Sequence, residues 1–206
     1  MISFETITHR LALALCLATP QVIAQTPYPV DTVAGGYLLR DWNRYVLTRS
    51  SEDLLAFYNS LLAVDLVEMD KQRMFPPLED AMANNFAILR ERIRALDTCT
   101  VRIAFVLRVF TYNADFSQGL NFQLADIIVP APHLFLEELK KRPSNLVNAV
   151  CACDPPRDSP DTDCVGVAKR RIQSLARVTD PQLTAIRDAC IALLKETYSG
   201  LQTPSK

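Results

Sequence analysis

PPLEDAMANNFAILRERIRAL, residues 76–96, is the stretch that decides the fold. Its apolar side chains recur every three or four residues, and its charged side chains lie mostly on the other side. The apolar positions are Leu78, Met82, Phe86, Leu89, Ile93 and Leu96. This period predicts an amphipathic α-helix, and Pro77 falls in its first turn, where a helix tolerates proline best.

The neighbouring segments also predict helices. Upstream, residues 51–74 form an amphipathic pattern that Ser50 or Ser51 can cap, with its apolar stripe at Leu55, Tyr58, Leu62, Leu66 and Met69. A further helix is expected over 31–47. Downstream, residues 98–112 follow the cap candidates Asp97 and Thr98 and are apolar around nearly the whole circumference, which is typical of a central helix. A pair of strands is the alternative for this β-branched run.

The remaining chain continues the helical pattern. Weaker or shorter helices are expected over 113–129, 132–141 and 143–151, and two final helices carry Cys164 to Leu175 and Leu183 to Thr197 on their apolar faces. Between them, 154–163 (DPPRDSPDTD) is a polar surface loop. We therefore expect residues 25–206 to form one all-α domain of seven or eight helices. They would pack as antiparallel hairpins, either as a bundle or as a short HEAT-like αα stack.

Residues 1–24 have the pattern of a secretory signal peptide. A polar start is followed by the apolar run 11–18 and by a small-residue site ending at Ala24. We expect cleavage before Gln25 and a periplasmic or secreted protein. The run is too short for a membrane span, and Cys16 lacks the context of a lipid-modified cysteine.

Composition narrows the functional classes. The chain carries 22 Lys and Arg against 23 Asp and Glu, and the signal segment removes one of each. A near-neutral charge without a polybasic run disfavours nucleic acid and a membrane surface as partners. With only 5 glycines in the chain, a glycine-rich phosphate loop is also disfavoured.

No catalytic pattern stands out. His133 is the only histidine after the signal segment, and it lies in the first turn of an expected helix, where a solvent-exposed role is favoured. The adjacent acid pairs 52–53, 79–80 and 137–138 lie at helix starts or on polar faces, where acids need no catalytic role. The loop acids Asp154, Asp158, Asp161 and Asp163 lack the order of an EF-hand. We expect no cofactor and no metal site.

The cysteines indicate disulfides. In an exported chain, Cys151, Cys153, Cys164 and Cys190 favour disulfides over zinc, since they lack separated CxxC pairs. Cys153 and Cys164 flank the polar loop, so we expect a bridge between them, with Cys151–Cys190 as the second bridge and Cys99 as a free thiol.

Function is expected to be protein binding without catalysis, as in an envelope inhibitor or immunity-type protein. Trp42 is a candidate interface anchor, although it would serve equally well to close one end of the core. The run Lys169, Arg170 and Arg171 is a candidate patch for an acidic partner, although such runs are usually solvated helix faces. The alternatives are a carboxylate-based cell-wall or polysaccharide hydrolase and a structural or assembly factor of the envelope.

Overall fold

The computed structural model describes residues 33–66, 69, 75–111, 113–153 and 163–198. These residues form ten α-helices and two short 3-10 helices, with no strand among them, which confirms an all-α domain and excludes the strand pair at 98–112. The elements are α2 (Val33–Thr48), α3 (Ser51–Ala63), α5 (Pro76–Asn84), α6 (Phe86–Arg94), α7 (Thr98–Phe110), α8 (Ala114–Asp126), α9 (Pro132–Lys141), η1 (Pro143–Asn145), α10 (Leu146–Cys151), α11 (Cys164–Ala176), η2 (Pro181–Leu183) and α12 (Thr184–Thr197).

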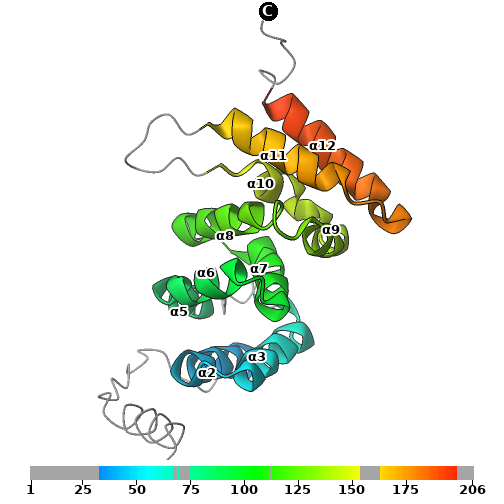
Figure 1. Cartoon of the computed structure of the whole chain (residues 1–206). Coiled ribbons are helices and arrows are strands. Elements are labelled where there is room, and N and C mark those ends of the chain that lie inside the picture. The colour runs from blue at the N-terminus through cyan, green and yellow to red at the C-terminus, as the bar shows by residue number, and fades with distance from the viewer. Residues whose placement is uncertain (1–32, 67–68, 70–74, 112, 154–162, 199–206) are drawn as a thin grey trace, which may run out of the picture.

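The helices follow one another through the molecule in chain order. Figure 1 shows α2 and α3 at one end, α7 near the middle, and α11 and α12 at the other end. Helix α2 packs on α3 and α5, α7 packs on α6 and α8, and α12 packs on α10 and α11. This arrangement fits the expected packing of helical hairpins, as a bundle or a short stack.

Helix α7 is the centre of the core. Its residues Val101 and Ile103 to Leu107 are all buried, as its uniformly apolar sequence predicts. Phe105 meets Phe135 of α9 with ring centroids 5.6 Å apart. Asp97 caps α7 by accepting from the backbone N of Thr100 at 2.7 Å.

Two helices differ from the sequence prediction. The helix expected over 51–74 ends at Ala63, because Val64 takes an extended conformation with ψ 146°. The helix expected over 76–96 is divided at Asn85, whose φ of −113° and ψ of 22° interrupt the helical backbone between α5 and α6. The Asn85 amide donates to the Ala81 carbonyl at 2.9 Å, which satisfies one group that the break exposes.

A glycine lets α8 approach α6. The Cβ of a larger residue at Gly119 would lie 2.8 Å from a ring carbon of Phe86, closer than real Cβ contacts come. The same ring meets Phe116 edge-on at 5.6 Å. The close packing of these two helices therefore depends on a residue without a side chain at position 119.

No helix in the described part of the chain is long and apolar enough to cross a membrane. The expected signal segment, 1–24, lies outside the described residues, and so do 154–162 of the polar loop.

Candidate functional site

Helix α2 is fixed at the end of the stack by its aromatic face. Trp42 and Tyr45 are fully buried, and the Trp42 ring meets Phe57 of α3 at 5.5 Å. The Trp42 indole N–H donates to the Ala81 carbonyl of α5 at 3.2 Å. Trp42 therefore closes one end of the core, which is one of the two roles expected for it, and its side chain is not exposed on this surface.

The turn between α2 and α3 is organised around Asp53. Its carboxylate accepts from the Thr48 hydroxyl at 2.6 Å and the Ser50 hydroxyl at 3.0 Å, and it pairs with Arg44 at 2.7 Å. In return, the Ser50 hydroxyl accepts from the Asp53 backbone N, as in a capping box. The hydrogen bond from Thr48 is the largest cause that holds the pKa of Asp53 below its ordinary value.

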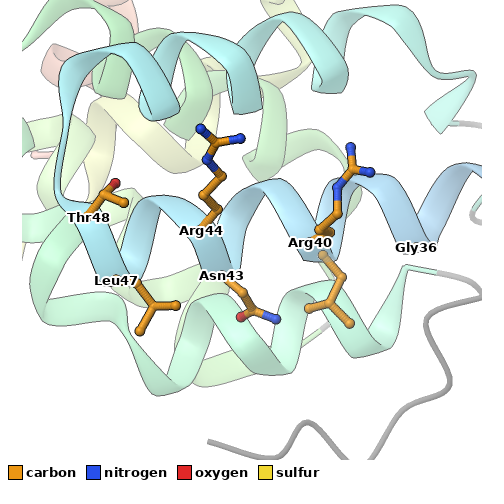
Figure 2. A pocket seen from close by; sticks show the side chains of 7 residues that line it. Gly36, Arg40, Asn43, Arg44, Leu47 and Thr48 are labelled. Carbon is orange, nitrogen blue, oxygen red and sulfur yellow. The ribbon is translucent and has the colours of Figure 1, made fainter. Parts of the chain in front are cut away.

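A groove of about 330 Å³ runs along the outer side of α2 (Figure 2). Its described lining lies entirely on this helix, at positions that repeat every three or four residues, so the groove follows one helical face. We call this feature the α2 groove, and its lining residues are Gly36, Leu39, Arg40, Asn43, Arg44, Leu47 and Thr48.

The α2 groove combines an apolar surface with two basic side chains. Leu39 is nearly buried, whereas Leu47 is 76% exposed. In Figure 2, Leu47 and Asn43 point to one side of α2, and Arg40 and Arg44 point to the other. The surface thus offers both an apolar contact and a basic edge.

The exposed charge at this edge is positive. Arg40 pairs with Asp41 at 3.1 Å, and Arg44 pairs with Asp53 at 2.7 Å. The two arginine side chains are 58% and 72% exposed, whereas the two acids are 14% and 11% exposed. An approaching partner therefore meets the guanidinium groups and not the carboxylates.

Exposed apolar side chains concentrate on the α2–α3 hairpin. Of the seven large hydrophobic residues that are exposed in the described chain, four lie on these two helices. They are Tyr37 and Leu47 on α2 and Leu55 and Leu62 on α3. The other three, Val109, Val129 and Val147, are spread over the rest of the stack.

Two of these residues correct the sequence prediction. Leu55 and Leu62 were expected in the buried stripe of the 51–74 helix, but α3 instead buries Leu54, Phe57 and Leu61. The buried face is displaced by one residue around the helix, because the contact with Trp42 places Phe57 inward. The helix therefore keeps a second apolar face that points away from the core.

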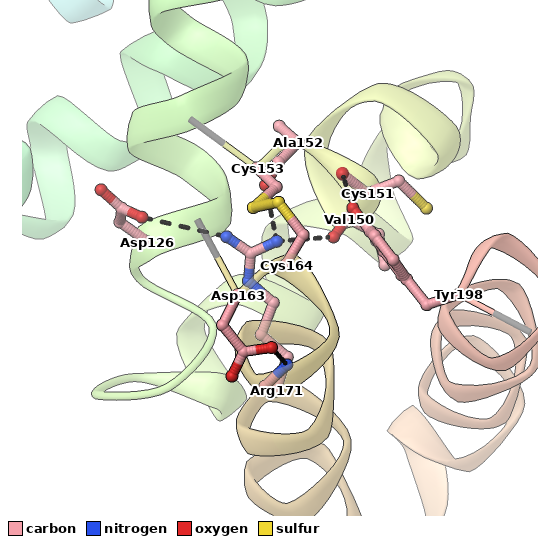
Figure 3. The surroundings of a disulfide bond; sticks show 10 residues. Asp126, Val150, Cys151, Ala152, Cys153, Asp163, Cys164, Arg171 and Tyr198 are labelled. Carbon is pink, nitrogen blue, oxygen red and sulfur yellow. Dashed lines mark hydrogen bonds and ion pairs between the residues drawn. A yellow bond between two sulfur atoms is a disulfide. The ribbon is translucent and has the colours of Figure 1, made fainter. Parts of the chain in front are cut away.

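The basic run on α11 does not form one patch. Lys169 and Arg170 are exposed, as expected. Arg171 is buried, and its guanidinium donates to the Ala152 carbonyl at 2.6 Å and the Val150 carbonyl at 3.2 Å (Figure 3). Arg171 therefore holds the end of α10 against α11, and of the three basic residues only Lys169 and Arg170 are exposed.

One of the two expected disulfides is present. Cys153 and Cys164 are bonded, with their Cα atoms 5.9 Å apart, and the bridge closes the polar loop (Figure 3). Asp163, at the end of that loop, caps α11 by accepting from the backbone N of Gly166 at 2.7 Å. The Cys153–Cys164 prediction is confirmed.

The expected Cys151–Cys190 bridge is not formed. Both residues are free thiols, as is Cys99, which was expected to be free. The Cys151 sulfur lies 3.3 Å from the Thr197 hydroxyl, and Thr197 is two helical turns along α12 from Cys190, or about 10 Å at 1.5 Å per residue. A disulfide requires Cα atoms within about 7 Å, so the observed position of Cys151 does not suit this bridge.

The candidate catalytic groups are separate from one another. His133 is 54% exposed and contacts Glu137 at 3.6 Å and Asp180 at 3.4 Å. Buried Glu79 accepts from the backbone N of Asn113 at 2.7 Å. These contacts join helices and loops of the fold, and none of these groups lines the α2 groove.

Glu138 is the most enclosed acid. It is fully buried and pairs with Arg102 at 3.1 Å, Lys141 at 2.6 Å and Arg142 at 3.1 Å. Burial alone would raise its pKa, but the hydrogen bonds from Lys141 and Arg102 outweigh burial and lower it. A general acid needs the opposite shift, so this carboxylate is suited to an ion pair that joins α7 and α9.

No known protein family, curated protein or solved structure matches the chain. The described residues also contain no group of His, Cys, Asp and Glu side chains placed to hold a metal ion. The α2 groove is a surface cavity in the described part of the chain that combines apolar and basic side chains. Sequence reasoning missed it, although the adjacent Arg40 and Arg44 on one helix, ending at Leu47, were its visible signal.

Proposed function

We propose that the protein is an exported, non-catalytic module that binds another protein through the α2 groove. The observation that carries this proposal is the groove itself, an apolar surface with a basic edge on the terminal hairpin of a helical stack. Packed helical hairpins are rigid scaffolds, and exposed apolar side chains on the hairpin of α2 and α3 offer a place for a partner. An inhibitor or immunity-type protein of the envelope would act in this way, by occupying a surface of its target.

Two features support export. Residues 1–24 have the three-part pattern of a signal peptide, and the Cys153–Cys164 bridge is typical of an oxidising compartment. The test is N-terminal sequencing of the protein from periplasmic and culture fractions, which should return Gln25. Recovery of Met1 would contradict export by this signal.

Site-specific photo-crosslinking tests the binding surface. A photoreactive residue at position 47 in the α2 groove should give one discrete adduct in the envelope fraction, and mass spectrometry would identify it. Position 147 is the matched control, because Val147 is similarly exposed, at 59%, but lies on α10. Adducts of equal yield from both positions, or none from position 47, would refute binding through the α2 groove.

A further inference from the structure

The dimensions of the α2 groove suit a single helix. Its lining extends from Gly36 to Thr48, which is about 18 Å along the axis at 1.5 Å per residue, or three to four turns. The lining positions repeat with the period of a helix, so a second helix lying alongside would meet the same face at each turn. Helix-in-groove recognition of this kind places apolar anchors at i, i+3 or i+4, and i+7.

The charges of the groove select the partner. Arg40 and Arg44 are one helical turn apart at its edge, and they remain mostly exposed while their own acids are buried beneath them. No acidic residue is among the described residues that line the groove. Guanidinium groups with free edges bind carboxylates in a bidentate manner, so an acidic helix is the complementary occupant.

The same charges disfavour a second copy of this chain. In a twofold pairing through α2, each groove would face the same groove of the other copy. Arg40 and Arg44 would then meet Arg40 and Arg44, and like charges at an interface oppose association. A partner of a different kind therefore fits better.

We propose that the α2 groove binds one amphipathic helix of a partner protein, with an apolar stripe against the exposed Leu47 and carboxylates against Arg40 and Arg44. This inference rests on the proposed binding function and specifies the chemistry of its partner. A cation–π contact restrains the Arg40 side chain, because its guanidinium lies 5.0 Å from the centre of the Tyr37 ring.

Two designed helical peptides test the proposal. Both have 18 residues and the same leucine stripe, and one carries glutamates along its flanks where the other carries lysines. Fluorescence anisotropy with the purified protein should show that the glutamate peptide binds at least 10-fold more tightly. Raising the salt concentration should weaken this binding. Equal binding of the two peptides, or no binding of the glutamate peptide, would overturn the proposal.

Variants locate the peptide on the groove. Leu47→Glu should weaken the glutamate peptide by at least 10-fold, and Arg40→Glu should weaken it while strengthening the lysine peptide. Val147→Glu is the matched control and should leave both affinities unchanged. Circular dichroism confirms that each variant is folded, and Arg40→Gln gives a milder second variant if Arg40→Glu is unstable. Unchanged affinity in folded Leu47→Glu protein would overturn the assignment.

Sedimentation velocity tests whether a second copy of this chain occupies the α2 groove instead. A concentration-dependent dimer that Leu47→Glu abolishes would show that a second copy occupies the groove, and this result would overturn the proposal. If position 47 crosslinks to a discrete partner but the glutamate peptide does not bind, the binding function stands and the acidic-helix inference fails. The two proposals therefore fail on different measurements.

Discussion

Two residues take a left-handed backbone conformation that glycine normally supplies. Arg49 has φ 57° and Leu96 has φ 58°, and each follows the end of a helix. The Arg49 N–H donates to the Tyr45 carbonyl, and the N–H groups of Leu96 and Asp97 donate to Ile93 and Arg92 in a Schellman pattern. These bonds end α2 and α6 at the cost of backbone strain.

Replacing Arg49 by glycine should stabilise the protein. A left-handed conformation costs a non-glycine residue about 1–2 kcal/mol, and glycine loses about 0.5–1 kcal/mol more backbone entropy on folding, so the net gain lies between about 0 and about 1.5 kcal/mol, centred on about 0.75 kcal/mol. Thermal unfolding measures it. Leu96→Gly is the control and should destabilise, because Leu96 packs against the core. A lower melting temperature for Arg49→Gly would contradict the strain at this position.

The free thiols should differ in reactivity. Burial, with a smaller contribution from Cys151, raises the pKa of Cys190 to about 12. At pH 8 the reactive thiolate at Cys190 is therefore on the order of 10⁻⁴ of the total. Native alkylation followed by peptide mapping should label half-buried Cys151 well before Cys190, and denaturation should remove the difference. Equal rates in the native protein, or a recovered Cys151–Cys190 peptide, would show that this interface is not packed as described.

Helix α9 joins the middle of the stack through Glu138. The carboxylate is fully buried, while its three basic partners reach it from α7 and from the end of α9 itself. An ion pair of this kind adds little net stability, but the loss of one member leaves the others without compensation. The connection between α7 and α9 is therefore sensitive to this one residue.

Glu138→Gln should lower the free energy of unfolding by about 2–4 kcal/mol, somewhat less than the about 3–5 kcal/mol of a fully buried broken pair, because the partners are partly exposed. Chemical denaturation measures the change. The adjacent Glu137→Gln is the matched control, since Glu137 is 44% exposed and its ion pair is with the exposed His133. That control should change stability by less than about 0.5 kcal/mol. Equal losses for both variants would contradict the role of Glu138.

Sequence patterns predicted the elements better than their contacts. Helix α9 begins at Pro132 and ends at Lys141, as the prolines and the apolar period indicated, and α7 is central to the core as expected, although Val109 near its end is exposed. In α3, neighbouring leucines such as Leu54 and Leu55 satisfy the helical period on two faces, and only the contact with Trp42 decides which face is buried. Such tertiary contacts are not encoded in the period of one helix.

The candidate site depended on the same kind of information. Arg171 belongs to a basic run, a pattern that predicts a solvent-exposed helix face. The structure instead buries it, with its guanidinium donating to the carbonyls of Val150 and Ala152. Around α2 the sequence shows similar numbers of acidic and basic residues. Only the structure shows that Arg40 and Arg44 are exposed while their acid partners are mostly covered. The Cys153–Cys164 bridge was predictable, since both cysteines flank one polar loop.

At the scale of the whole molecule, one continuous core extends from Leu38 on α2 to Leu194 on α12. Two ion-paired acids lie beside different parts of this core. Asp53 is on the α2–α3 hairpin, and Glu138 is on α9 next to α7. The pKa of each is lower in the folded protein than its ordinary value of 3.8 or 4.5. Because the core is shared, protonation at either place affects the stability of the whole stack.

Stability should therefore fall in acid. A carboxylate with a lowered folded pKa binds fewer protons in the folded state than in the unfolded state. Its contribution is present above the unfolded pKa and is lost as the pH falls through the folded pKa. We expect urea unfolding to show similar stability at pH 7 and pH 6 and a steep decline below about pH 4.5, the ordinary value for a glutamate.

A double variant, Asp53→Asn with Glu138→Gln, tests the origin of this decline. It should be less stable at neutral pH and should lose less stability than the native sequence between pH 5 and pH 3, because the two groups that bind protons on unfolding are gone. Glu52→Gln with Glu137→Gln is the matched control. Glu52 precedes Asp53 and is exposed, and Glu137 precedes Glu138 and is half-buried. If the acid decline of the double variant is as steep as that of the native chain, Asp53 and Glu138 do not cause it, and the loss of stability must come from other carboxylates.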